Sequence, residues 1–265
     1  MKNYIINNHN EIRILFFILF LFLFMYLEKK YPMKDNIKIF SLRLINNFIL
    51  FFLNIILLKI LLPFLAVTFS IYISSNNIGI FNIININTFI TLIISLILFD
   101  LTIYLQHFLF HKSSFLWKFH RVHHADTDLD VSTGLRFHPV EIFISMLIKF
   151  LFITIMGPPV LAVLIFEIIL NTSSMFNHSN IFLSNRTDLF IRKFIVTPNM
   201  HRTHHSNKFD NQNKNFGFNL SIWDIIFKTH KYYNTENLDN LKIGINEFCS
   251  KKELWIHKIL LQPFK

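Results

Sequence analysis

The chain has 265 residues, of which 52% are hydrophobic, and it carries a formal net charge of +10. A soluble domain of this size cannot cover so much apolar surface without large exposed patches, so the composition favours a membrane protein. The basic charge suits anionic lipid headgroups. No nucleic-acid motif accompanies the charge, so nucleic acid is not among the predicted partners. The single cysteine, Cys249, excludes an internal disulfide and a cysteine-based metal site.

Five apolar stretches follow one another along the chain, and we predict that they are helices in or across a membrane: Ile12–Leu27, Leu44–Ile73, Thr88–Gln106, Val140–Met156 and Val160–Met175. About 20 residues cross a bilayer, so the second stretch is longer than needed, and Pro63 is predicted to kink it. Gly157-Pro158-Pro159 predicts a tight turn, so the last two stretches are expected to form a helical hairpin. Each arm of this hairpin is shorter than the length needed to cross a bilayer fully.

Charge placement predicts the orientation of these helices. Basic residues, among them Lys29, Lys30 and Arg43, lie between the first two stretches, whereas the loop from Ser74 to Asn87 carries no charge. Positive loops favour the cytoplasmic side. We therefore expect a multi-pass protein with its histidine-rich part on the cytoplasmic face of a bacterial inner membrane or the endoplasmic reticulum.

Eight of the thirteen histidines form three close clusters: His107 and His111; His120, His123 and His124; His201, His204 and His205. Residues three and four apart share a helix face, so each cluster is predicted to aim its imidazoles at one point. Imidazole is the commonest protein metal ligand. Eight or more ligands exceed the four of a tetrahedral zinc and indicate two first-row metals with open positions. This pattern leaves a redox site, a hydrolytic site, and a closed structural or storage site as alternatives.

Further motifs accompany the histidines in a regular order: Asp100 seven residues before His107, Leu116-Trp117 before His120, Arg136-Phe-His138-Pro139-Val-Glu141, Phe176-Asn-His178, Thr197-Pro198 before His201, and Asn215-Phe-Gly217 before Trp223-Asp224. In this order they resemble the fatty acid hydroxylase superfamily, the sterol desaturase-like membrane hydroxylases, over about half the chain. Phe108 and Lys228 stand where the family often has Arg and Gly, which leaves the specific substrate open.

The resemblance implies an all-α membrane protein, with about four to five transmembrane or hairpin helices capped by a cytosolic helical domain that holds two irons. We expect an N-terminal transmembrane region at 1–95, a catalytic domain at 96–235 that includes the hairpin 140–175, and a C-terminal cytosolic tail at 236–265. The metal ligands implied by the resemblance are the eight clustered histidines and His178, a ninth. No catalytic side chain beyond the metal centre is predicted.

The implied activity is that of a diiron oxygenase that uses O2 as co-substrate to hydroxylate a fatty acyl chain, a sterol or a related lipid. Desaturation and ether cleavage of an alkylglycerol on the same site are alternatives, and a membrane metal-binding protein without redox turnover is a third. No haem- or flavin-binding segment is visible. Electrons are therefore expected from an external cytochrome b5-like or ferredoxin-like protein.

Asp100 and His138 are candidates for supporting roles around the metal ligands. A carboxylate inside a membrane helix costs about 2.5–3.5 kcal/mol and needs a partner. Asp100 is expected either to hold the far nitrogen of a ligand imidazole or to bind an arginine or a backbone group. His138 precedes Pro139, a position biased away from helical geometry, and it either supports a ligand or forms a hydrogen bond at a helix start.

Overall fold

The structure, a computed structural model, describes residues 2–35, 42–84, 86–233, 238 and 241–265. Within these residues the regular elements are helices, and extended backbone pairs only as isolated bridges such as Pro32 with Ile181. This confirms the prediction of an all-α membrane protein. The division into regions at 1–95, 96–235 and 236–265 stays a prediction.

Five stretches of the described residues are long and apolar enough to cross a membrane: α2 (His9–Lys30), Leu42–Ile83, α6 (Thr88–Lys112), α8 (Pro139–Met156) and α9 (Val160–His178). All five were predicted from composition. The second contains α3 (Leu42–Leu61), α4 (Ala66–Ser75) and the short α5 (Ile80–Ile83). The predicted kink at Pro63 is instead a full break between α3 and α4, because proline lacks the N–H of a helix and disfavours helical geometry in the residue before it.

The helical hairpin forms as predicted, but both arms are longer than expected. α8 has 18 residues and α9 has 19, which at 1.5 Å per residue gives lengths close to the hydrocarbon thickness of about 30 Å. Gly157 ends α8 with φ 59°, a left-handed conformation that glycine adopts without strain. The turn also packs against Gly79, where an added Cβ would lie 2.3 Å from the Gly157 nitrogen.

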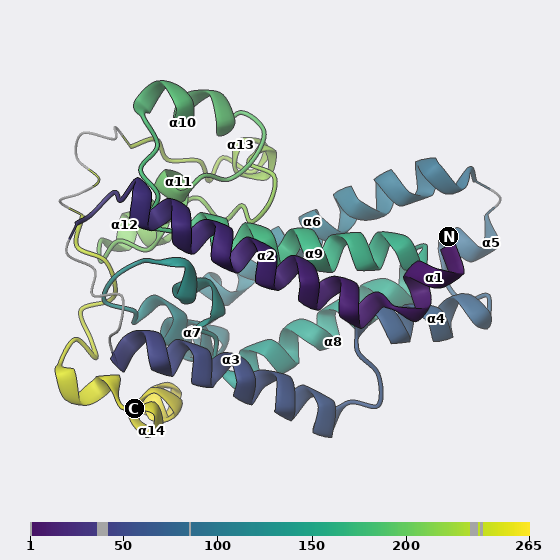
Figure 1. Cartoon of the computed structure of the whole chain (residues 1–265), viewed down its shortest axis with the longest axis horizontal. Helices are drawn as coiled ribbons and strands as arrows, with labels where there is room; N and C mark the ends of the chain where they lie inside the picture. Colours follow the sequence, from purple (N-terminus) through teal and green to yellow (C-terminus); the bar gives the residue numbers. More distant parts are fainter. Residues whose placement is uncertain (1, 36–41, 85, 234–237, 239–240) are drawn as a thin grey trace.

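The long helices run side by side, with the N-terminus, α5 and the hairpin turn at one end and a helical cap at the other (Figure 1). An apolar core fills the space between α4, α6, α8 and α9, where Phe99 stacks on Phe166 with 4.6 Å between ring centroids. The cap contains α7 (Ser114–His124), the 3-10 helix η1 (Val131–Leu135), α10 (Asn185–Ile191), α11 (Pro198–His204), α12 (Phe209–Gln212), α13 (Ile222–Ile226) and α14 (Ile256–Leu261).

A buried polar network joins the cap to α3. Arg43 donates from Nη1 to Asp126 Oδ2 at 2.9 Å, and Asn47 donates to the same oxygen at 3.2 Å. Burial alone would raise the pKa of Asp126, but the charges of Arg43 and Arg136, with hydrogen bonds from Thr133 and Asn47, offset it and lower the pKa. Asp126 therefore stays ionised and ties α3 to the segment that follows α7.

Candidate metal centre

Four helices bring the histidines of the cap together. His107 and His111 lie near the C-terminal end of α6, the α7 cluster follows directly, and His178 is the last residue of α9. Local sequence sets the start of two of these helices. Ser113 accepts a hydrogen bond from the Leu116 N–H as the N-cap of α7, and Thr197 caps α11 in the same way, with Pro198 at its first position.

All nine predicted histidines lie together, and among the described residues they form two groups. Within each group, one ring nitrogen from every member lies within 4.8 Å of the others. The group of five contains His107, His111, His120, His124 and His204, and the group of four contains His123, His178, His201 and His205. All are buried except His111, which is half-buried. Nine nitrogen donors in two adjacent groups can hold two metal ions.

The prediction that each cluster aims at one point is wrong in detail. Histidines four residues apart lie in the same group. The middle histidine of each three-histidine cluster lies in the opposite group: His123 in the group of four and His204 in the group of five. The reason is helix geometry. Each residue turns the helix by about 100°, so positions i and i+4 diverge by about 40° whereas positions i+3 and i+4 diverge by about 100°.

Hydrogen bonds to backbone carbonyls orient four of these rings through Nδ1: His107 to Phe216 at 2.8 Å, His123 to Arg136 at 3.0 Å, His178 to Ser174 at 2.6 Å and His204 to Lys214 at 2.8 Å. A carbonyl only accepts, so Nδ1 carries the proton in each ring. In a neutral ring, Nε2 is then a lone-pair donor for a metal.

The spacing of the Nε2 atoms fits a metal ion. His178 Nε2 lies 2.9 Å from the Nε2 atoms of His123 and His201, and His205 Nε2 lies 3.2 Å from that of His201. His123 and His178 both donate from Nδ1 to carbonyls, so their Nε2 lone pairs face each other and repel unless a cation lies between them. A first-row metal bound at about 2.1 Å places ligands at right angles about 3.0 Å apart. In the group of five, buried Nε2 atoms of His111, His120 and His204 have no hydrogen-bond partner among the described residues, which also fits metal binding.

Burial keeps the imidazoles of His124, His204 and His205 uncharged. It lowers the pKa of His204 to about 3 and holds the pKa values of His124 and His205 well below the usual imidazole value. A neutral imidazole has the lone pair that a metal needs. These three rings therefore offer nitrogens that could bind a metal without losing a proton at physiological pH.

Glu141 is a functional candidate that sequence reasoning missed. Its buried carboxylate accepts a 2.6 Å hydrogen bond from His120 Nδ1, the one such carboxylate–imidazole contact among the described residues. Such a contact orients a ligand ring and raises its basicity. The sequence feature that could have indicated this role is the Arg136-to-Glu141 motif, which places an acidic residue in the first turn of the helix that starts at Pro139.

Asp100 and His138 support the structure without contacting a ligand imidazole. Asp100 binds backbone groups, the second of the expected alternatives: its carboxylate accepts from the Asn219 and Leu220 N–H groups, and also from the Asn219 amide and the Trp223 indole. His138 caps α8, as one of its alternatives predicted, by accepting from the Val140 N–H at 3.2 Å.

Comparison with known proteins gives relatives that are hydroxylases and monooxygenases. The chain is 29% identical to an ornithine lipid hydroxylase of Rhizobium tropici over 166 residues, 62% of this chain and 47% of the relative. It is 28% identical to the alkylglycerol monooxygenase of Homo sapiens over 56% of this chain and 32% of the relative, and 26% identical to that of Danio rerio over 62% and 35%. The matched part thus spans less than half of each relative. No solved structure matches.

The family model described as fatty acid hydroxylase matches residues 92–229, slightly more than half of the chain. All nine histidines of the two groups, Glu141 and Asp100 fall within this match. By this match, the chain belongs to the fatty acid hydroxylase family.

Proposed function

We propose that each histidine group holds one iron ion and that the chain uses O2 to hydroxylate a C–H bond of a membrane lipid. The division of nine buried imidazoles into adjacent groups of five and four supports this most directly. Imidazole suits iron, and among the described residues neither group contains a carboxylate or thiolate, so the metals keep strong Lewis acidity.

When bound, the two irons supply the one-electron steps through which O2 is reduced. Overall, R–H, O2, two electrons and two protons give R–OH and water, so the carbon is oxidised while one oxygen atom leaves as water. We propose that the electrons come from an external cytochrome b5-like or ferredoxin-like protein.

The chain's own residues orient the ligands and exclude water. Backbone carbonyls and Glu141 hold the rings through Nδ1, and burial keeps solvent from the nitrogens. The groups lie where α6 and α9 end, beside the apolar spans α8 and α9. A lipid chain from the bilayer can approach the metals from there. A transporter would instead place its ligands near the middle of the spans.

A second outcome on the same site is attack on the carbon beside an ether oxygen, which breaks an alkylglycerol ether. The two alkylglycerol monooxygenases among the relatives favour it. Both outcomes require the same metals and the same electron supply, so they differ in the lipid that binds.

The test is oxygen uptake by protein reconstituted in vesicles with a lipid extract and a reductant, followed by mass spectrometry of the lipids. Hydroxylation adds one oxygen atom, ether cleavage releases a free alkyl chain as an aldehyde, and desaturation removes two hydrogens. We expect His204→Ala to abolish uptake and His257→Ala, at an exposed histidine outside both groups, to leave it unchanged. Bound zinc with no oxygen uptake under any reductant would refute the proposal.

A further inference from the structure

Helix α10 of the cap buries its acidic residue and exposes large apolar side chains. Asp188 is fully buried and pairs with Arg192, whose guanidinium lies 4.7 Å from the centre of the Tyr232 ring. Two large apolar side chains point outward, with Phe190 64% exposed and Leu189 40%, and Arg186 is exposed beside them. A surface helix of a soluble protein turns its charges outward and its apolar stripe inward.

Helix α13 repeats this arrangement. Asp224 is fully buried, and its carboxylate accepts from the Phe216 and Gly217 N–H groups at 2.8 Å each. The outward residues are apolar again, and Ile225 and Ile226 are each 55% exposed. Two helices that bury their aspartates and expose their aliphatic and aromatic residues suit an apolar surrounding.

The two helices form one surface. The segment after α10 pairs with the segment before α13, since the Ser221 N–H donates to the Phe194 carbonyl at 3.3 Å and the Val196 N–H to the Asn219 carbonyl at 2.9 Å. Phe194, 60% exposed, continues the apolar side between them. We call the exposed apolar side chains of α10 and α13, together with Phe194 and Ile195, the outer apolar face. Figure 1 shows α10 and α13 on the same side of the cap.

This face lies at the level of a membrane span. The Trp223 indole of α13 donates to Asp100 Oδ2 at 2.8 Å, and Phe227 stacks on Tyr104 with centroids 5.1 Å apart. Asp100 lies twelve residues after Thr88, the first residue of α6, and thus about 18 Å along that helix. This is less than the hydrocarbon thickness of about 30 Å. A bilayer that α6 crosses from Thr88 therefore reaches α13.

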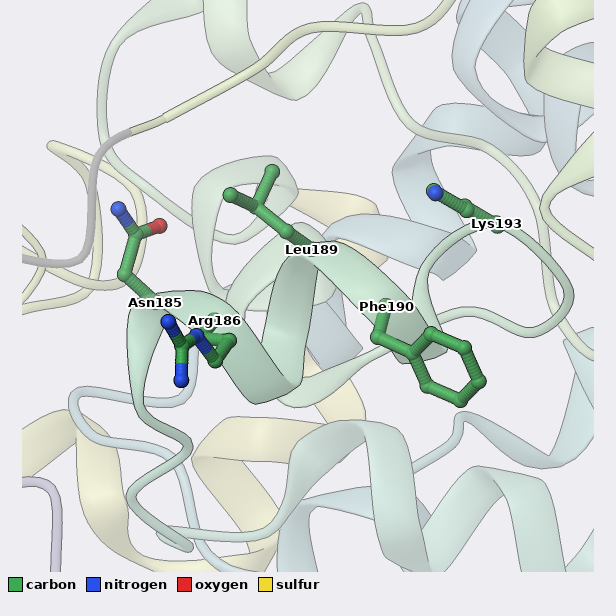
Figure 2. Close-up of a pocket in the computed structure, with 5 residues that line it drawn as sticks. All are labelled: Asn185, Arg186, Leu189, Phe190 and Lys193. Carbon is green, nitrogen blue, oxygen red and sulfur yellow. The ribbon is translucent and has the colours of Figure 1, made fainter.

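Cations border the apolar residues of α10. Arg186 and Lys193 line a shallow surface hollow with Asn185, Leu189 and Phe190, and all five side chains come from α10 and the residues just after it (Figure 2). Neither cation forms a salt bridge with an acidic residue in the described part of the chain. Cations beside apolar side chains complement the phosphates and acyl chains of anionic lipids.

We propose that α10 and α13 lie in the membrane interface, with the outer apolar face in the acyl boundary and Arg186 and Lys193 against the phosphates of anionic phospholipids. The proposal is independent of the reaction at the metal centre. It places the lipid surface next to the loop whose Phe216 carbonyl holds His107.

The test uses spin labels on single cysteines of the full chain in a Cys249→Ser background. The labelled variants are Phe190→Cys, Phe194→Cys, Ile225→Cys and Ile226→Cys, and the control is Phe209→Cys, whose residue in α12 is 77% exposed. In phosphatidylcholine vesicles with phosphatidylglycerol, we expect the ratio of collisions with O2 to collisions with a water-soluble nickel complex to be several-fold higher at the four positions than at the control. Ratios equal to the control would overturn the proposal and indicate a face that binds another protein.

The role of the two cations is tested separately by adding Arg186→Gln and Lys193→Gln to the Phe190→Cys variant. With both cations present, replacing part of the phosphatidylcholine by phosphatidylglycerol should raise the collision ratio at position 190, because anionic headgroups draw α10 deeper. The double variant should lose this response. A response that persists without the cations would overturn their assignment as lipid ligands.

Discussion

Adjacent histidines that share one motif belong to different groups in the cap. His204 lies in the group of five and His205 in the group of four. At the residue scale, the repeated His-x-x-His-His spacing thus supplies both groups from each helix, which ties their positions together. A shift of α7 or α11 along its axis would displace ligands of both groups at once.

This division predicts the metal content of two neighbouring variants. With one iron per group, as proposed, His204→Ala and His205→Ala should each lower the bound iron from two ions per chain toward one, because each removes a nitrogen from a different group. Metal analysis of the purified protein measures this, with His257→Ala as the control that keeps both ions. Unchanged iron in both variants would contradict the assignment of these residues as ligands.

Glu141 gives a second prediction at this scale. Glu141→Ala removes the acceptor for His120 Nδ1 and should weaken metal binding or activity by about 10- to 100-fold, the usual cost of a lost outer partner. Glu141→Gln should recover part of the loss, because its amide oxygen still accepts the proton. Titration of the metal-free variants with iron measures the affinity. Glu247→Gln, at an exposed carboxylate paired with Arg121, is the control.

At the scale of elements, the loop between α12 and α13 depends on a carboxylate from α6. Asp100 accepts hydrogen bonds from Asn219, Leu220 and Trp223, and the same loop carries the Phe216 carbonyl that holds His107. The membrane helix and the loop thus position the ligand ring from two sides. This explains an acidic residue within an apolar span better than a direct contact with an imidazole.

Asp100→Asn should therefore destabilise this loop. The amide places an N–H2 against groups that also donate, and each buried donor left unpaired costs about 1–3 kcal/mol. We expect a lower apparent unfolding temperature in detergent and a red-shifted emission of Trp223 in a Trp117→Phe, Trp255→Phe background. Asp210→Asn, at an exposed position of α12, should change neither. An unchanged emission in Asp100→Asn would show that the carboxylate does not hold the indole.

At the scale of the whole molecule, the cap and the loop before α6 lie at opposite ends of the helices that are long and apolar enough to cross a membrane (Figure 1). The uncharged loop and the basic residues on the cap side together favour a cytoplasmic cap. This sidedness also suits the proposed function, because the expected electron donors are cytoplasmic proteins.

The only cysteine, Cys249, lies exposed in the cap and tests the sidedness directly. A membrane-impermeant maleimide should label it only after the membrane is permeabilised. Asn76→Cys in a Cys249→Ser background should react in intact cells, since Asn76 lies in the exposed loop at the other end. Labelling of Cys249 in intact cells would reverse the orientation.

The sequence by itself determined the class of the protein. The five apolar stretches, the hairpin at Gly157 and the family were predicted correctly, because hydropathy and motif spacing are local properties of the chain. The nine histidines lie together in two groups, and their role as metal ligands stays a prediction. Pro63 was predicted to kink one helix, whereas the structure has a full break between α3 and α4.

Only the tertiary structure decided how these parts act together. His120 and Glu141 are 21 residues apart, and Asp100 and Asn219 are 119 apart, so their contacts depend on the packing of separate helices. The division of histidines into two groups and the outward apolar residues of α10 and α13 have the same origin. A spacing shows which side chains share a helix face, but the neighbouring helices determine what that face meets.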